Sequence, residues 1–157
     1  AGVQMGIDII PGVLVICTFV MMLTGGPGAE GAYTGAAFEG IGLLPQIGEA
    51  LQFLLKPLFG LQSAQGIAVP ITALGSSGAS LSIVTRLAKE GLAGPHDIAV
   101  FTAMCMCMSG YLSTHVAMMN ALGFSPLTGK AILSHTLGGL AAGVCAHWLY
   151  TLLELII

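Results

Sequence analysis

Four long windows of this chain contain no Asp, Glu, Lys or Arg, and this feature limits what the chain can fold into. The windows cover residues 9–29, 57–85, 98–129 and 131–153. An α-helix rises about 1.5 Å per residue, so about 20 apolar residues cross a hydrocarbon layer about 30 Å thick. Each window is therefore long enough to cross a membrane as a helix.

The composition agrees with lipid as the main solvent. The 157 residues include 4 Lys+Arg and 7 Asp+Glu, or 7% charged residues, where soluble domains carry roughly 25%. Mean hydropathy is +0.94. A net charge of −3 without a basic run excludes nucleic acid as a partner. We expect residues 1–157 to form one all-α domain, a polytopic integral membrane protein with about three transmembrane crossings.

The first third of the chain predicts a span, a link and a surface helix. Residues 7–24 are apolar and are followed by Gly25-Gly26-Pro27-Gly28, which ends a helix. Residues 25–45 are rich in glycine and are expected to lie outside the lipid, because their amides need partners. Residues 46–57 place leucines at helical spacing, with polar residues between them. This pattern predicts an amphipathic helix at the membrane surface.

Residues 62–90 predict a re-entrant helical hairpin. Gly75-Ser76-Ser77-Gly78 interrupts the apolar run at its centre, and two glycines in a helix cost roughly 1 kcal/mol each relative to alanine. Two half-helices that meet at this tip fit better than one continuous helix, with Ser76 or Ser77 as the N-cap of the second. A kinked helix that crosses completely is the alternative. Half-helices directed at the midplane form substrate sites in transporters.

Residues 97–123 predict a second discontinuous element. The polar run 109–114 interrupts apolar residues at a depth that corresponds to the middle of the membrane. The candidate site residues of this break are Ser113, Thr114 and His115. His115 is ionisable and could couple transport to protons, or it could bond a backbone carbonyl that the break leaves open.

Residues 128–155 predict an unbroken span with a face of small residues. These are Gly138, Gly139, Ala142, Gly143 and Ala146. Small residues at this spacing let a second helix approach closely. Three crossings and a hairpin are too few to enclose a pathway, so we expect a partner, either another copy or a sibling protein.

Charge placement predicts a topology. The predicted hairpin puts Lys56, Arg86 and Lys89 on one side and Lys130 on the other. Positive charges favour the cytoplasmic side, so the C-terminus is expected inside and the N-terminus outside. No hydrolase, metalloprotease or nucleotide-binding motif occurs, so no enzymatic activity and no cofactor are expected.

A cluster of soft ligands leaves a metal alternative open. It consists of Met104, Cys105, Met106, Cys107, Met108 and His115, which would suit copper(I). Cys105 and Cys107 are about 200° apart on a helix, so they do not converge on one ion. Packing is therefore the first interpretation and no metal site is expected, with soft-metal transport as an alternative.

The order of these elements resembles the nucleoside-recognition Gate family. The resemblance rests on IIPGVLVICTFVMML, LLKPLFGLQSAQG, ALGSSGASLSIVTRLAKEGLAGPHDIAVF and MSGYLSTHVAMMNALG. The family includes spore maturation protein B, small paired inner-membrane proteins of bacteria, and gate regions of ferrous iron and concentrative nucleoside transporters. The chain has Ser113-Thr114 where many small members have Asn-Pro, and its tip lacks the Gln and Glu of nucleoside transporters.

The resemblance implies a transporter or channel subunit in the bacterial inner membrane, with lipid around it and a sibling Gate protein or a second copy beside it. Its ligand would be a small polar solute, nucleoside-like by resemblance. The implied contact residues are Gly75, Ser76, Ser77 and Gly78 at the tip and Ser113, Thr114 and His115 in the break. A membrane assembly protein of the spore maturation type, which does not transport, is the alternative.

Overall fold

The computed structural model describes residues 2–28, 31–36, 39–108 and 110–157. It is 78% helical, with no strand among the described residues, so the predicted all-α class is confirmed. The α-helices are α1 (Gly2–Thr24), α2 (Leu43–Ala50), α3 (Gln52–Phe59), α4 (Ala68–Ala73), α5 (Ser77–Lys89), α6 (Pro95–Met108), α7 (Tyr111–Ala121) and α8 (Thr128–Ile156). Two 3-10 turns, η1 (Ala64–Ile67) and η2 (Ser125–Leu127), precede α4 and α8.

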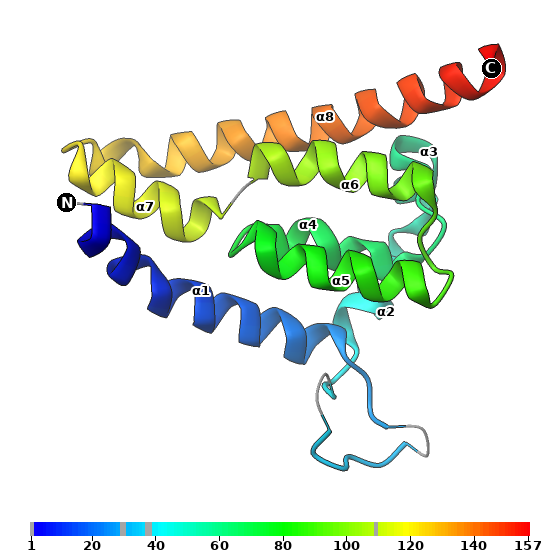
Figure 1. Ribbon diagram of the computed structural model, residues 1–157, viewed down its shortest axis with the longest axis horizontal. Coiled ribbons are helices and arrows are strands. Elements are labelled where there is room, and N and C mark those ends of the chain that lie inside the picture. Colours follow the sequence, from blue (N-terminus) through cyan, green and yellow to red (C-terminus); the bar gives the residue numbers. More distant parts are fainter. Residues whose placement is uncertain (1, 29–30, 37–38, 109) are drawn as a thin grey trace.

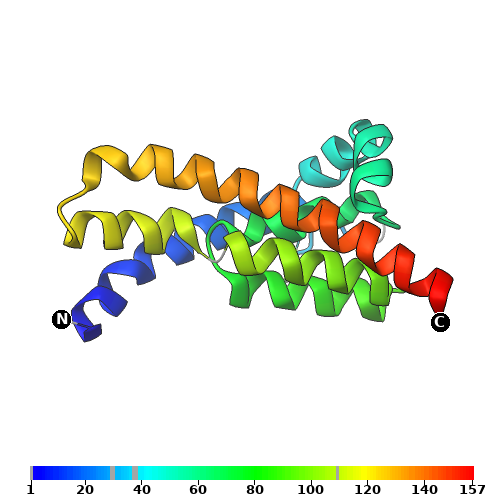
Figure 2. The ribbon, with the colours of Figure 1, turned by 90° about the horizontal axis from the view of Figure 1, so that it is seen from above.

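Three helical paths run along the long axis of the molecule. In Figure 1, α8 extends over nearly the whole length, α6 and α7 lie end to end beneath it, and α1 runs along the opposite side. Figure 2 shows the same end-to-end placement of α6 and α7 from above. The 29 residues of α8 correspond to roughly 43 Å of helix.

Helices α4 and α5 form a short hairpin that ends near the middle of the molecule. They pack against each other, and their connecting turn points away from the end at which both α3 and the C-terminus lie (Figure 1). Asp97 joins the two ends of this hairpin: its Oδ1 accepts from the Gln62 amide at 2.9 Å and its Oδ2 from the Gly94 amide at 2.9 Å. The chain therefore enters and leaves the hairpin at the same end.

The helix bounds differ from the predicted ones in three places. Helix α1 begins at Gly2, ahead of the predicted 7–24. The predicted surface helix 46–57 is two helices, which meet at Leu51 and end at Phe59. The predicted broken element 97–123 begins at Pro95, and α7 ends at Ala121. The predicted last span, 128–155, lies within α8.

Two helices of the described chain are long and apolar enough to cross a membrane, namely Gly6–Thr24 and Ser125–Ile156, which includes η2. Their apolar side chains are largely uncovered: Phe19 is 60% exposed and Leu149 60%. The core helix of a soluble protein would bury such residues. The length, composition and exposure of these two helices are therefore compatible with a membrane protein.

Two glycines of α8, Gly139 and Gly143, pack closely against α6 of the same chain. A Cβ on Gly139 would lie 2.7 Å from the Met108 Cε, and one on Gly143 would lie 2.6 Å from the Met104 Cγ. Gly138 has nothing within 4 Å of its Cβ position. At Gly139 and Gly143, the predicted small-residue face therefore packs against a helix of the same chain. These two glycines are not an exposed surface for a partner.

Part of the glycine-rich link folds around the Glu39 carboxylate. Glu39 accepts from the Thr34 hydroxyl at 2.6 Å and from the Thr34 and Gly35 amides at 2.9 Å and 2.8 Å. Hydrogen bonds from the Thr34 hydroxyl, then from the backbone amides, lower the pKa of Glu39. The folded link thus favours the ionised carboxylate.

We expect amide protection in this link to depend on pH through Glu39. Because the folded pKa is lowered, the stabilisation is complete above the ordinary glutamate pKa of about 4.3 and is lost as pH falls through the lower folded value. Hydrogen exchange should show protected Thr34 and Gly35 amides at pH 7 and lost protection in Glu39→Gln. Glu49→Gln, on α2, is the control. Equal protection in both variants would contradict this role.

Candidate functional site

The turn between α4 and α5 is built by a serine cap. Ser76 has an extended backbone, and its Oγ accepts from the Ala79 amide at 3.3 Å. A side-chain oxygen that binds a free amide of the first turn is the usual N-cap arrangement. The prediction that Ser76 or Ser77 caps this helix is confirmed for Ser76.

Ser77 has a different role from its neighbour. Its hydroxyl is buried and has no hydrogen-bond partner among the described residues. It lines a cavity of about 230 Å³ between α5 and α6. The other lining residues are Ser80, Leu81, Val84, Ile98, Phe101, Thr102, Cys105 and Met106. A buried hydroxyl without a partner costs about 1–3 kcal/mol, so a hydrogen-bonding ligand in this cavity would relieve that cost.

The other polar groups of this cavity are already occupied. The Ser80 hydroxyl donates to the Ser77 carbonyl at 2.7 Å and lies 3.6 Å from the Cys105 Sγ. The Thr102 hydroxyl donates to the Ile98 carbonyl at 2.7 Å. Among the described residues, the cavity therefore offers one open hydroxyl in mostly apolar surroundings and has no charged residue in its lining. Such a site suits a small neutral solute.

The hairpin turn meets the break between α6 and α7. Gly110 lies in this break with φ 59°, in the left-handed region that favours glycine. Its amide donates to the Ala73 carbonyl, the last of α4, at 2.9 Å. Helix ends leave backbone groups without intrahelical partners, and here two interrupted elements satisfy each other. This contact joins the tip and the break at the middle of the molecule.

The candidates beyond the break lie in a helix. Thr114 and His115 are in α7, which begins at Tyr111, and the Thr114 amide donates to the Gly110 carbonyl. The His115 ring lies 4.4 Å from the His135 ring of α8, edge to face. Neither of these two residues lines the cavity beside Ser77. The interruption falls within the predicted polar run 109–114, at Gly110, but the candidates Ser113, Thr114 and His115 lie in the helix that begins directly after it.

Two parts of the predicted break lie outside the described structure. Residue 109 is not among the described residues, and the side chain of Ser113 is not described. The backbone of Ser113 is helical.

The two tip glycines are not equivalent. A Cβ on Gly75 would lie 2.5 Å from the Ile16 Cγ2 of α1, so Gly75 lets the tip approach α1 closely. A Cβ on Gly78 would have only the Ser76 Oγ nearby, at 3.6 Å. Gly75 is therefore a packing residue, and Gly78 is an open position in the first turn of α5.

Asp97 is the residue that sequence reasoning missed. It is 1% exposed and holds both ends of the hairpin through its two carboxylate oxygens. An acidic residue at the third helical position that accepts from the N-cap amide is half of a capping box. The sequence Gly94-Pro95-His96-Asp97 contains that signal. The amide of Gln62, distant in the sequence, could not be found from it.

All four histidines form two pairs between α8 and the α6–α7 path. The His96 Nε2 lies 2.9 Å from the His147 Nδ1, and the second pair is His115 with His135. The ring of His147 thus forms a hydrogen bond between α8 and α6. Among the described residues no group of three or more His, Cys, Asp or Glu could hold a metal ion.

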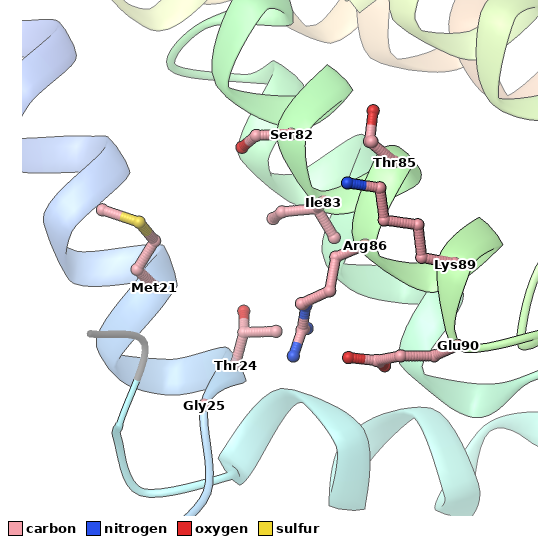
Figure 3. A pocket seen from close by; sticks show the side chains of 9 residues that line it. All are labelled: Met21, Thr24, Gly25, Ser82, Ile83, Thr85, Arg86, Lys89 and Glu90. Atoms are coloured by element: carbon pink, nitrogen blue, oxygen red, sulfur yellow. The ribbon is translucent and has the colours of Figure 1, made fainter. Parts of the chain in front are cut away.

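Two further cavities flank the hairpin. One, of about 450 Å³, lies between α3, α4, α6 and α8 and is almost wholly apolar; Thr136 is the one polar side chain among the described residues that line it. The other, of about 320 Å³, lies between the end of α1 and the last turns of α5 (Figure 3). Arg86, Lys89 and Glu90 line it, and these are charged groups that the Ser77 cavity lacks.

The fold and the site together define an all-helical protein with two helices suited to cross a membrane and with two interrupted elements that meet at mid-length. No family model, curated protein or solved structure matches the chain.

Proposed function

We propose that this protein is a subunit of a membrane transporter or channel for a small polar, neutral solute. The observations that carry the proposal are the contact of the end of α4 with the α6–α7 break and, at the start of α5, a buried Ser77 hydroxyl without a partner among the described residues. Transporters place substrate sites where discontinuous helices meet near the midplane. The absence of a charged residue from the cavity lining favours a neutral ligand.

The distribution of the charges supports the proposed membrane placement. Lys56, Arg86 and Lys89 lie on the elements at the C-terminal end of the long axis, and Lys130 lies near the start of α8 at the other end (Figure 1). In this placement α1, the α6–α7 path and α8 are three crossings, and the hairpin enters from the end that carries three cations. That end faces the cytoplasm by the positive-inside rule.

The subunit would work with a partner. Three crossings do not surround the Ser77 cavity, whereas transporter sites lie between related repeats or subunits. A second copy or a sibling protein of the Gate family that the sequence resembles would complete the pathway. Since Gly139 and Gly143 already receive α6, the partner would use other apolar surface, such as the face around Gly138.

Flux measurements with Ser77 variants test the transport proposal. In proteoliposomes that contain the protein and its partner, Ser77→Leu should lower solute flux at least tenfold, because leucine fills the cavity and removes the hydroxyl. Ser77→Ala should lower it less, since the space remains. Ser134→Leu, on the exposed side of α8, is the matched control and should keep full flux. The solute panel should include nucleosides.

Two outcomes would contradict the proposal. Flux that survives Ser77→Leu would place the pathway elsewhere, and a lack of flux for every solute would favour a membrane assembly protein.

Cysteine labelling at Gln62 and Glu90 tests the hairpin separately. Both positions should be labelled from the same side of the membrane, and labelling from opposite sides would make residues 62–90 a complete crossing.

A further inference from the structure

The cavity at the base of the hairpin has charges of both signs, which complement those of a zwitterionic lipid headgroup. It is about 320 Å³ and lies between the end of α1 and the last turns of α5. In Figure 3 the Arg86 guanidinium lies between Thr24 and the Glu90 carboxylate, and the Lys89 side chain extends beside Thr85. Met21 and Ile83 form its apolar part. Two of the four cations of the chain are gathered here.

These cations have no partner inside the described chain. Neither Arg86 nor Lys89 lies within 4.0 Å of a carboxylate oxygen among the residues that the structure describes. Their side chains are not needed to cap the C-terminal end of α5, because the amides of Glu90, Gly91 and Leu92 already donate hydrogen bonds to its last carbonyls. Thr24, on the facing wall, donates its hydroxyl to the Val20 carbonyl. The positive charge is therefore open to a ligand.

We propose that this cavity binds the headgroup of an ethanolamine phospholipid. Arg86 and Lys89 would hold the phosphate, which guanidinium binds with two parallel hydrogen bonds, and Glu90 would hold the ammonium. The apolar side chains of Met21 and Ile83 would contact the start of the acyl chains. Basic pockets between helices at the cytoplasmic side bind the phosphates of cardiolipin and phosphoinositide headgroups, and the phosphate of an ethanolamine lipid offers the same group. The inference rests on the proposed membrane placement and not on transport.

Glu90 makes the ethanolamine headgroup the best match. A phosphatidylglycerol headgroup has a phosphate but no cation, so the Glu90 carboxylate would face an anionic lipid without compensation. A phosphoethanolamine headgroup has one negative and one positive group. With this headgroup, each of the three charged side chains of the cavity faces a group of opposite charge.

Native mass spectrometry of the purified full chain, given equal amounts of the two lipids with identical acyl chains, tests this assignment. The wild type should retain phosphatidylethanolamine about tenfold better than phosphatidylglycerol. Arg86→Gln and Lys89→Gln should lower retention of both lipids. Glu90→Gln should remove the preference. Lys56→Gln loses the same charge at an exposed position of α3, outside the cavity, and should behave as wild type.

Three results would overturn the assignment. These are unchanged retention in Arg86→Gln, an equal loss in Lys56→Gln, and binding of soluble O-phosphoethanolamine as tight as that of the lipid, which would indicate a solute site. Thermal unfolding of each variant checks its fold. Ser77→Leu should keep lipid retention whatever its flux, so failure of the transport proposal is distinguishable from failure of this one.

Discussion

Replacement of Asp97 by alanine should lower the free energy of unfolding by about 3 kcal/mol. The substitution removes both acceptors that hold the Gln62 and Gly94 amides at 2.9 Å, and a buried donor without a partner costs about 1–3 kcal/mol. Thermal unfolding in detergent should show a midpoint roughly 5–10 °C lower. The hairpin base should then open, which cysteine accessibility at Gln62 would detect.

Two further variants separate the bridge from the loss of a negative charge. Asp97→Asn keeps one acceptor oxygen, so we expect about half of the effect. Asp8→Ala removes an exposed carboxylate that accepts only from the Gln4 side chain on the same helix and should be nearly neutral. A midpoint for Asp97→Ala within 1–2 °C of wild type would show that the two ends of the hairpin are held by other contacts.

Alanine at Gly75 should displace the tip and strongly reduce flux. Its Cβ would lie 2.5 Å from the Ile16 Cγ2 and 2.9 Å from the Ile16 Cβ, and the branched side chain of Ile16 has little freedom to move aside. Overpacking of this kind costs typically 1–3 kcal/mol. The Ala73 carbonyl next to the tip accepts a hydrogen bond from the Gly110 amide. A shifted tip would therefore also disrupt this contact between the hairpin and the α6–α7 break. We expect flux to fall at least tenfold.

Gly78→Ala is the matched control for that prediction. It is the same change three residues along, where the nearest atom is the Ser76 Oγ at 3.6 Å. Alanine in a helix is up to about 1 kcal/mol more favourable than glycine, so this variant should be as stable as wild type or more so. If both variants lost flux equally, the tip glycines would act through backbone freedom and not through the approach to α1.

Several features of this fold could be predicted from local pattern. The Gly75–Gly78 run and the polar run 109–114 indicated interruptions, and helices do end near both, at Ala73 and Met108. The second interruption is shorter than the polar run indicates, because Ser113 to His115 are polar but lie in the helix that follows Gly110. A single left-handed glycine decides where the helix stops. The polarity of its neighbours does not.

Other features required the folded chain. The match of the Ala73 carbonyl with the Gly110 amide, the bridge from Asp97 to Gln62 and the packing of Gly143 on Met104 join residues far apart in the sequence. The same holds for the Ser77 hydroxyl. Nothing local distinguishes it from the Ser76 hydroxyl, which binds an amide of its own helix, whereas that of Ser77 lies buried in a cavity that α6 closes.

The amino-acid sequence alone determined the helical class and the approximate positions of the interruptions, because glycine, proline and charge act within a turn or two of where they stand. The tertiary structure decided which interruption meets which, which hydroxyl is left without a partner and which small-residue face is already filled. Those outcomes depend on packing between segments that are distant in the sequence. A local sequence pattern cannot indicate which distant residues become neighbours when the chain folds.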